Sequence, residues 1–491
     1  MLPFESLIPI DKSSGLPAYQ QITHHMIKHI RNGVIKPGLL LPGTRELAGI
    51  LKLHRKTIIA AYDELAAQGW TVVIHRKGFI VAENLPDVKP RQWDNDATGY
   101  AFNSKIPGPF YHVNQTVPFI PVAGTAQPHL IIDDGHPDTR LAPMIQLHRE
   151  YRSRLQQQHV VKQVSAALSA GSFKLREAMV AYMAQTRGMQ AQAENILITH
   201  GAQMSIYLAA SLLLRPGDYV IVGEPGYYLA NQVFEYLGAK IITIPVDRHG
   251  IDITAVHDAC KQHPVKALYV IPHHHHPTTV TLSPDRRMRL LEMAEQFNFT
   301  IIEDDYDYDF HYTSSPYLPL AAGNHHNRVV YIGSFSKALS ATIRIGFMIA
   351  ASDFLKHAVY LRRMVELRGD HVMEESLAAL IENGDIGRHL KKVNKIYCER
   401  RDYLCTLLDT YLNNIVHYTK PDGGMAVWLT FDKRYPLTEI SAKAAKHGLF
   451  INNGTLFDSG DIRYNALRFG FASLNMEELK EAVEIITKVV K

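Results

Sequence analysis

A chain of 491 residues is longer than a single hydrophobic core normally supports, so at least two domains are expected. The composition, 46% hydrophobic and 20% charged, is that of a globular protein, and no run of about 18 apolar residues is present that could span a bilayer. The chain starts without the basic and apolar segments of a secretory signal, and its three cysteines show neither metal-type nor redox spacing. We therefore expect a cytoplasmic protein with reduced thiols and no membrane contact.

The basic charge of the chain is confined to its first sixth. Residues 1–82 hold 10 Lys and Arg against 5 Asp and Glu, whereas all other residues together hold 42 against 43. A basic segment suits binding to a phosphate backbone, because neutralising the phosphates releases condensed counterions. Solvated faces of many proteins are equally basic, so the pattern of elements in this segment carries more weight than its charge.

Three helices and a hairpin are predicted in the basic segment. Apolar residues at spacings of three and four predict a first helix that ends at Asn32-Gly33. Thr44 is the expected N-cap of a short second helix, and a third helix is expected over residues 55–68. Two short β-prone runs follow, at 71–74 and 79–81. This order predicts a small α+β winged helix-turn-helix.

A helix-turn-helix places its second helix in the major groove of DNA, where residues near the start of that helix reach base edges. Arg55, Lys56 and Thr57 hold these positions, while cations on the preceding helix and on the wing are placed to meet phosphates. The predicted DNA-contacting residues are Arg45, Arg55, Lys56, Thr57, Arg76 and Lys77. A helical dimerisation module with solvated cations is the alternative interpretation.

Further along the chain, short β-rich runs alternate with helical stretches, which predicts an α/β domain with a mostly parallel sheet. The five runs are 196–198, 219–222, 267–271, 300–302 and 329–332. Before them the periodicity fades and prolines accumulate. We therefore expect a DNA-binding domain over 1–82, a linker over 83–128 and a large domain over 129–491.

A lysine follows the last of these strands, in Ser334-Phe335-Ser336-Lys337, and Arg344 comes seven residues later. A lysine at a strand end can condense with an aldehyde, while hydroxyls and an arginine can hold a phosphate through charge-assisted hydrogen bonds. This combination suits pyridoxal phosphate (PLP). A lone lysine is usually just a solvated side chain, so the interpretation depends on other segments.

Other segments supply the remaining parts that such a cofactor needs. Gly201-Ala202 lies between a strand and a helix, where the amides of a helix N-terminus can receive phosphate. Asp304 follows a buried-looking strand, and a carboxylate there can hold the pyridine nitrogen protonated. Tyr306 can donate to the phenolate oxygen of the ring, and Tyr227 offers an aromatic face that can stack on it.

The N-terminal segment is similar to the signature of GntR-type winged helices, through Leu41-Pro42-Gly43-Thr44-Arg45-Glu46-Leu47-Ala48, Arg55-Lys56-Thr57 and Ala61-Tyr62-Asp63-Glu64-Leu65. The motifs of the large domain, in their order, resemble fold-type I PLP-dependent aminotransferases of class I/II. The whole chain resembles the MocR/GabR branch of the GntR regulators. Further matches to that branch are Asp134-Gly135-His136-Pro137-Asp138, Leu175-Arg176-Glu177-Ala178, Arg286-Arg287 and Leu467-Arg468-Phe469-Gly470-Phe471-Ala472.

The resemblance implies a role for each of these site residues. Lys337 would form the internal aldimine, Asp304 would pair with the ring nitrogen, Tyr306 would contact the ring oxygen and Tyr227 would stack on the ring. Arg468 matches the arginine that binds the α-carboxylate of an amino acid, a role that its planar fork suits. The residues implied around the phosphate are Gly201, Ala202, Ser334, Ser336 and Arg344.

The chain departs from the family at Pro272-His273-His274-His275-His276-Pro277-Thr278-Thr279, where relatives usually read Pro-Ser-His-Gln-aromatic-Pro-x-Gly. His275, His276 and Thr279 thus replace a glutamine, an aromatic residue and a glycine, which leaves the contacts to the cofactor ring open. Four consecutive histidines also raise the alternative of a metal site. Adjacent side chains diverge, however, so no metal is expected.

The leading hypothesis is a DNA-binding transcription regulator in which PLP on Lys337 senses a small amino compound through external aldimine formation, with little or no turnover. The resemblance also implies a homodimer. One alternative is a catalytically active PLP-dependent aminotransferase with an accessory DNA-binding domain. Another is a dimerisation scaffold that no longer holds PLP.

Overall fold

The computed structural model describes residues 2–11, 14, 16–74, 78–85, 129–156, 169–313 and 317–490. The chain divides into two compact units, Met1–Tyr111 and His112–Lys491, and each is described by itself. Most of the predicted linker and the wing cations Arg76 and Lys77 lie outside the described residues. Within the described ranges, no helix combines the length and the apolar character needed to cross a membrane.

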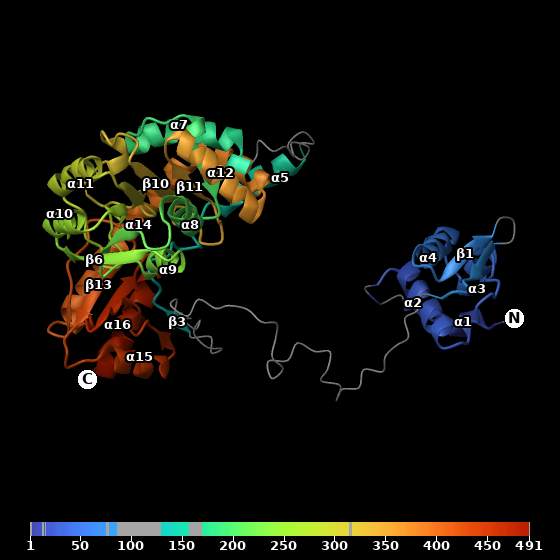
Figure 1. The fold of residues 1–491 in the computed structure, drawn as a ribbon. Coiled ribbons are helices and arrows are strands. Elements are labelled where there is room, and N and C mark those ends of the chain that lie inside the picture. Colours follow the sequence, from blue (N-terminus) through green and yellow to red (C-terminus); the bar gives the residue numbers. More distant parts are fainter. Residues whose placement is uncertain are drawn as a thin grey trace. The chain divides into compact units, whose positions relative to one another are not determined.

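The first unit contains three helices and a hairpin, preceded by a short helical turn (Figure 1). Its elements are α1 (Phe4–Leu7), α2 (Ala18–Arg31), α3 (Thr44–Leu51), α4 (Arg55–Ala67), β1 (Thr71–Ile74) and β2 (Gly78–Val81). The strands pair in antiparallel fashion, with Thr71 opposite Val81. The predicted winged helix-turn-helix is therefore confirmed.

The core of this unit is formed by the residues whose spacing predicted the helices. Ile22 and Met26 of α2 and Ile58 and Tyr62 of α4 are fully buried. The Tyr62 hydroxyl donates to the carbonyl oxygen of Pro42 at 2.8 Å, which satisfies the one polar atom that this ring brings into the core.

The predicted cap of the second helix is wrong by one residue. Helix α3 begins at Thr44, so Gly43 is the cap, and the Glu46 carboxylate accepts from the Gly43 N–H at 3.3 Å. The Thr44 hydroxyl instead accepts from Nε of Arg55 at 3.3 Å. Thr44 therefore links the two helices of the helix-turn-helix rather than capping the first of them.

The second unit is built on an eight-stranded sheet with the order β4-β11-β10-β9-β8-β5-β6-β7. The strands are β4 (Ile196–Thr199), β5 (Tyr219–Glu224), β6 (Lys240–Asp247), β7 (Gly250–Ile251), β8 (Val265–Val270), β9 (Thr300–Asp304), β10 (Val329–Ser334) and β11 (Gly346–Ile349). Strands β10, β9, β8, β5 and β6 are parallel neighbours, whereas β11 runs antiparallel to both β10 and β4. The predicted mostly parallel sheet is confirmed.

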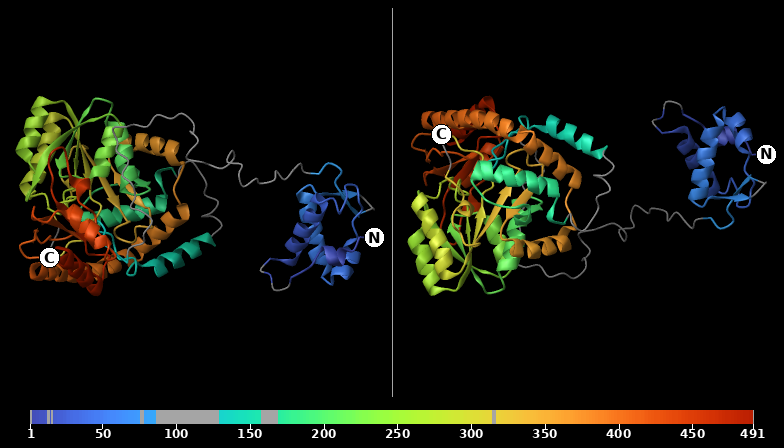
Figure 2. Two further views of the ribbon diagram at one scale, coloured as in Figure 1. Left: turned by 90° about the horizontal axis from the view of Figure 1, so that it is seen from below. Right: turned by 90° about the horizontal axis from the view of Figure 1, so that it is seen from above.

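Helices cover both faces of this sheet (Figures 1 and 2). One face packs against α8 (Ala202–Leu213), α9 (Tyr228–Tyr236) and α12 (Ser352–Glu366). The other packs against α10 (Ile253–Gln262), α11 (Pro284–Phe297), α7 (Phe173–Arg187), α13 (His371–Glu382) and α14 (Asp385–Tyr411). Because both faces are buried, the strands read as continuous apolar runs in the sequence.

The C-terminal part of the second unit adds a smaller sheet with helices. It contains β12 (Val416–His417), β13 (Ala426–Phe431), β15 (Ala466–Gly470), α15 (Leu437–Ala445) and α16 (Met476–Val490). Strand β14 (Leu449–Phe450) pairs with β3 (Leu130–Ile131), and α5 (Met144–Leu155) follows β3. The loop after β3 lies beside strand β15, which contains Arg468, because the N–H of Gly470 donates to the carbonyl of Asp133 at 2.9 Å. Short 3-10 turns lie at Ala193–Asn195, Leu320–Ala322 and Thr455–Phe457.

Candidate functional site

The predicted site residues gather at one edge of the large sheet. Strands β4, β5, β9 and β10 run in the same direction, so their carboxyl ends meet at this edge, which is where ligands bind in open α/β sheets. Asp304 is the last residue of β9, and Ser334 is the last residue of β10. The loop after β4 leads through Gly201 into α8.

Lys337 lies three residues beyond the end of β10 and is half-buried. Its Nζ donates to the carbonyl oxygen of Gly135 at 2.6 Å and lies 5.8 Å from the centroid of the Tyr306 ring. Burial lowers the pKa of this amine, although the carboxylate of Asp134 opposes the shift. A lowered pKa increases the fraction of neutral amine, which is the nucleophilic form.

Asp304 is fully buried, and one of its carboxylate oxygens accepts no hydrogen bond from the described residues. Its Oδ2 accepts from the hydroxyl of Tyr269 at 2.7 Å, whereas no donor in the described part of the chain reaches Oδ1. Burial raises the pKa of Asp304 to about 7, against the opposing hydrogen bond from Tyr269. A buried acceptor without a donor is costly. The protonated nitrogen of a pyridine ring is a donor that suits it, so this residue fits PLP.

The predicted phosphate residues are only partly brought together. Gly201 has φ +83° and caps α8, and a Cβ built on it would lie 2.8 Å from Nη2 of Arg344. The Arg344 guanidinium is thus held against the N-terminus of α8, where both the amides and the charge attract an anion. Ser334 Oγ accepts from the N–H of Ser336 at 3.1 Å, while Ser336 Oγ donates to the carbonyl of Ile343 at 2.8 Å.

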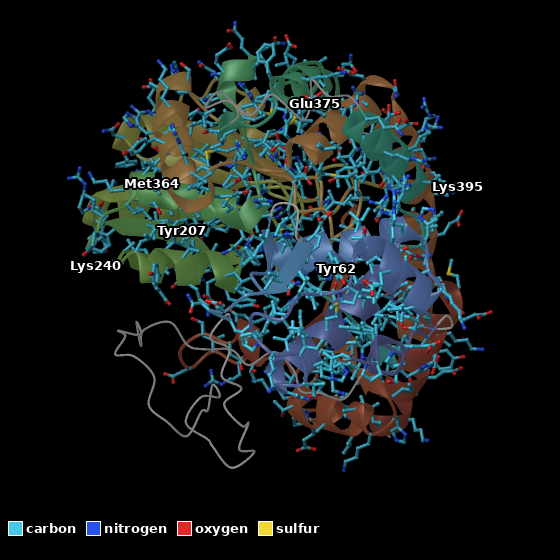
Figure 3. All side chains as sticks on the ribbon, turned by 90° about the vertical axis from the view of Figure 1, so that its right-hand side faces the viewer. Tyr62, Tyr207, Lys240, Met364, Glu375 and Lys395 are labelled. Atoms are coloured by element: carbon cyan, nitrogen blue, oxygen red, sulfur yellow. The ribbon has the colours of Figure 1, made fainter. Side chains whose placement is uncertain are left out.

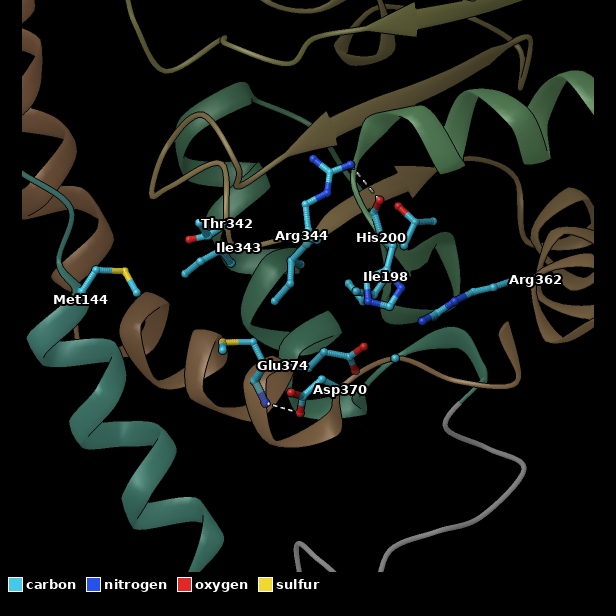
Figure 4. A pocket seen from close by; sticks show the side chains of 13 residues that line it. Met144, Ile198, His200, Thr342, Ile343, Arg344, Arg362, Asp370 and Glu374 are labelled. Atoms are coloured by element: carbon cyan, nitrogen blue, oxygen red, sulfur yellow. Dashed lines mark hydrogen bonds between the residues drawn. The ribbon is translucent and has the colours of Figure 1, made fainter. Parts of the chain in front are cut away.

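A cavity of about 290 Å³ is lined in part by Arg344 (Figure 4). Glu374 lines this cavity and accepts from the N–H of Ser172 at 2.5 Å. Burial raises the pKa of Glu374 to about 7. Neither Lys337 nor Asp304 lines the cavity, so it lies beside the predicted phosphate end and not at the predicted ring.

The two tyrosines predicted to contact the ring both contact the run of four histidines. The Tyr306 hydroxyl donates to the carbonyl of His274 at 3.1 Å and accepts from Nη2 of Arg468 at 3.0 Å. Burial raises the pKa of Tyr306, so its hydroxyl keeps its proton at neutral pH. Tyr227 is half-buried at the start of α9, with its ring 5.1 Å from and nearly perpendicular to that of His276.

The four consecutive histidines face four different partners. His273 bonds Asp305 and His274 bonds Asp307, both at 2.9 Å, while His275 bonds the hydroxyl of Thr278 at 2.9 Å. The fourth, His276, bonds Asp134 at 2.7 Å. All four rings are buried. In the described ranges, no three or more His, Cys, Asp or Glu side chains are grouped so that they could hold a metal ion.

Arg468 of β15 is buried, and it contacts a residue that the sequence did not single out. Its Nε lies 3.1 Å from Oδ1 of Asp134, and its Nη1 donates to the carbonyl of Pro277 at 3.0 Å. Asp134 is 334 positions earlier in the chain. The sequence signal for Asp134 was the motif that starts at this residue. The resemblance to the family implied no role for its carboxylate.

In the first unit, the predicted DNA-contacting residues lie at the helix starts. Arg45 follows the first residue of α3, and Arg55, Lys56 and Thr57 open α4. The side chains of Arg45, Arg55 and Lys56 are exposed, and Thr57 is half-buried. Of the six predicted residues, Arg76 and Lys77 lie outside the described residues.

Comparisons with known proteins agree with this division. Residues 18–81 match the family described as "Bacterial regulatory proteins, gntR family", and residues 157–486 match "Aminotransferase class I and II". The transcriptional regulator TauR of Rhodobacter capsulatus is 26% identical over 99% of this chain and 100% of its own length. The probable rhizopine catabolism regulatory protein MocR of Rhizobium meliloti is 25% identical over 97% of this chain and 94% of its own.

Among solved structures, the α-aminoadipate aminotransferase LysN of Thermus thermophilus superposes with a TM-score of 0.68 at 25% identity. The match covers 74% of this chain and 92% of LysN, which was solved with N-(5'-phosphopyridoxyl)-L-leucine. The fold is thus that of PLP-dependent aminotransferases, and the unpaired Oδ1 of Asp304 fits that cofactor. The chain belongs to the MocR/GabR subfamily of GntR-type transcription regulators, in which a winged helix precedes a class I and II aminotransferase domain.

Proposed function

We propose that this regulator senses a small amino compound at Lys337 of its PLP domain, and that the N-terminal winged helix converts binding into altered DNA affinity. The observation that carries the proposal is the arrangement at the sheet edge. A half-buried lysine with a lowered pKa follows the strand next to the one that ends in Asp304, with its unpaired oxygen, and the same sheet edge holds the anion-attracting end formed by Gly201 and Arg344. These are the parts that a phosphorylated pyridine aldehyde requires.

Each of these residues at the sheet edge would have its own role in binding and exchanging an amine. When bound, PLP supplies an aldehyde carbon on which a ligand amine exchanges with the lysine amine, without any change in oxidation state. Lys337 would supply the protein amine at that carbon, and the carbonyl of Gly135, which accepts from its Nζ, would orient that amine. Asp304 would keep the ring nitrogen protonated, Tyr306 would turn its hydroxyl hydrogen from the carbonyl of His274 to the ring oxygen, and Tyr227 would lie against the ring.

Binding at Lys337 changes DNA affinity only if the ligand favours one arrangement of the chain over another. On the DNA side we propose that Arg55, Lys56 and Thr57 enter the major groove, because they open the second helix of the helix-turn-helix. Arg45 would contact phosphate from the preceding helix. Arg76 and Lys77 of the wing are proposed as further phosphate contacts on the sequence alone.

We further propose that two copies pair through their large domains. Three side chains near the end of α12 are strongly exposed although they are apolar: Tyr360 (66%), Met364 (64%) and Leu367 (73%). Met364 is labelled in Figure 3. Ile145 of α5 is 84% exposed, and Met144 of the same helix lines a cavity together with Arg362 of α12, so the two helices border a common cavity. A second copy of the chain is the proposed partner, because apolar patches of this kind mark interfaces.

The test of the sensing site is the visible absorption spectrum of the full chain with PLP. The natural sequence and Lys240→Ala, a matched exposed lysine on β6, are expected to show a band near roughly 420 nm. Lys337→Ala is expected to lack it. A band of equal size in Lys337→Ala would overturn the proposal.

A second candidate function is transamination, because the site also contains Arg468, which matches the arginine that binds the α-carboxylate of an amino acid. Turnover of an amino donor with a keto acid by the PLP-loaded chain would favour this function. The proposal of a sensor predicts a ligand-dependent change in the absorption band without such turnover.

A further inference from the structure

The Asp134 carboxylate bridges two groups of the ligand site. Its Oδ1 lies 3.1 Å from Nε of Arg468, and its Oδ2 lies 2.7 Å from Nε2 of His276. The Asp134 side chain is 46% exposed in the single chain, so it borders the open part of the site and is not packed away from it. The predicted carboxylate-binding arginine is therefore already paired with a carboxylate of the protein.

The loop that carries Asp134 is held in place by its neighbours. Asp133 Oδ1 accepts from the N–H groups of Gly135 and His136 at 2.8 and 2.9 Å. The N–H of Gly470, at the end of β15, donates to the carbonyl of Asp133 at 2.9 Å. A Cβ built on Gly470 would lie 2.3 Å from Asp133 Oδ1, which shows how closely the loop approaches the strand. Asp134 is thus presented to Arg468 by an anchored backbone.

Asp134 and Arg468 form a pair of opposite charges without any ligand. Although burial among protein atoms acts to raise it, the pKa of Asp134 falls to about 2, because His276, Arg468 and Lys337 surround the carboxylate. Burial lowers the pKa of His276, so its ring is neutral at neutral pH. Arg468 contributes one positive charge and Asp134 one negative charge. The other two guanidinium nitrogens already donate to Pro277 and Tyr306.

We infer that Asp134 makes the site selective for primary amines that carry no carboxylate beside the amine, such as amino alcohols and diamines. A ligand carboxylate that approached Arg468 would meet the Asp134 carboxylate on the same guanidinium, and like charges placed together strongly disfavour binding. An amine without a carboxylate leaves the Asp134–Arg468 pair intact. The inference deepens the proposed function, since it rests on amine binding at Lys337.

Matched pairs of ligands that differ by one carboxylate test this inference. The dissociation constants of ethanolamine and serine, and of putrescine and ornithine, are measured on the PLP-loaded full chain by the shift of the visible band and by calorimetry. Each amine is expected to bind at least about tenfold more tightly than its amino acid, because like-charge contact is costly. Asp134→Asn is expected to strengthen serine binding by at least about tenfold relative to ethanolamine.

Two further variants separate charge from other effects. Asp134→Glu keeps the negative charge and is expected to keep the preference for ethanolamine. Asp461→Asn removes an exposed carboxylate in the loop before β15 and is expected to leave both constants unchanged.

Equal or tighter binding of serine than of ethanolamine by the natural sequence would overturn the inference, as would an unchanged ratio in Asp134→Asn. If no band that depends on Lys337 forms, the proposed function fails first and the inference falls with it. If the band that depends on Lys337 forms but shifts at the same concentrations of ethanolamine and of serine, the proposed selectivity is contradicted. The proposed function is then not contradicted.

Discussion

At the scale of single residues, the sequence could identify site residues that lie at the end of a predicted strand or shortly after it. Lys337 and Gly201 each follow a strand and Asp304 ends one, and the sheet brings the ends of these strands to one edge. The contact between Asp134 and Arg468 could not be predicted in this way, because it joins residues 334 positions apart. Long-range pairing of this kind has no local signal.

Thr279 is a departure from the family pattern that has a consequence for the backbone. Its φ is +62°, in the left-handed region, where a β-branched side chain is strained. The glycine that relatives usually have at this position would adopt the same backbone conformation without strain. The departure from the family pattern thus pointed to a position where the backbone is left-handed. The strain on Thr279 became visible only in the structure.

The raised pKa of Asp304 predicts a pH dependence of stability in the cofactor-free protein. The carboxyl has an ordinary pKa of 3.8 when exposed and about 7 in the folded chain, so the folded state holds its proton more tightly. The resulting stabilisation is complete below about pH 4 and is lost as the pH rises through about 7, with an upper bound of roughly 4 kcal/mol.

Asp304→Asn removes this titration while keeping an acceptor for the Tyr269 hydroxyl. The free energy of unfolding of the natural sequence, measured by urea titration from pH 4 to 8, should therefore fall relative to that of Asp304→Asn. Curves that stay parallel over this range would show that Asp304 does not titrate near neutrality.

At the scale of elements, the periodic helices of the first unit were predictable, whereas some strands of the second unit were not. Helices α2 and α4 match their predicted ranges to within one or two residues. Strands β6 and β11 were not predicted. Strand β11 has only four residues and begins with Gly346, and it enters the sheet antiparallel between β4 and β10, where tertiary pairing decides its conformation.

The start of α3 is the element whose charge can be tested directly. Arg45→Ala should weaken DNA binding and should reduce the slope of log K against log salt by about 0.9, the value for one lost phosphate contact on duplex DNA. Binding is measured with DNA fragments selected by the full chain. Lys261→Ala, an exposed lysine of α10 in the large unit, is the matched control and should leave the slope unchanged. An unchanged slope in Arg45→Ala would place that residue away from the phosphates.

At the scale of the whole molecule, the fold class of both domains followed from the order of the elements, because a basic three-helix segment with a hairpin and an alternating β/α segment each permit few architectures. The domain boundaries near residues 82 and 129 remain a prediction. The assembly was not accessible from the sequence pattern, since exposed apolar residues on α12 look like ordinary residues of an amphipathic helix until their burial is known.

The proposed pairing of two copies predicts a change in assembly. Met364→Glu places a charge in the exposed apolar patch, and an unpaired charge in such an interface costs several kcal/mol, so the dissociation constant of the dimer should rise at least about tenfold. Sedimentation analysis measures this. Met288→Glu, at a methionine of α11 that is also 60% exposed, is the matched control and should leave the assembly unchanged. Equal effects of the two variants would contradict the proposed interface.

The most direct test of the central claim is the affinity of the full chain for its selected DNA, measured with PLP, with and without ethanolamine, for the natural sequence and Lys337→Ala. The account predicts that ethanolamine changes the DNA affinity of the natural sequence and leaves that of Lys337→Ala unchanged. The same change in both proteins, or no change in a natural sequence whose absorption band has shifted, would contradict a sensor that acts through Lys337.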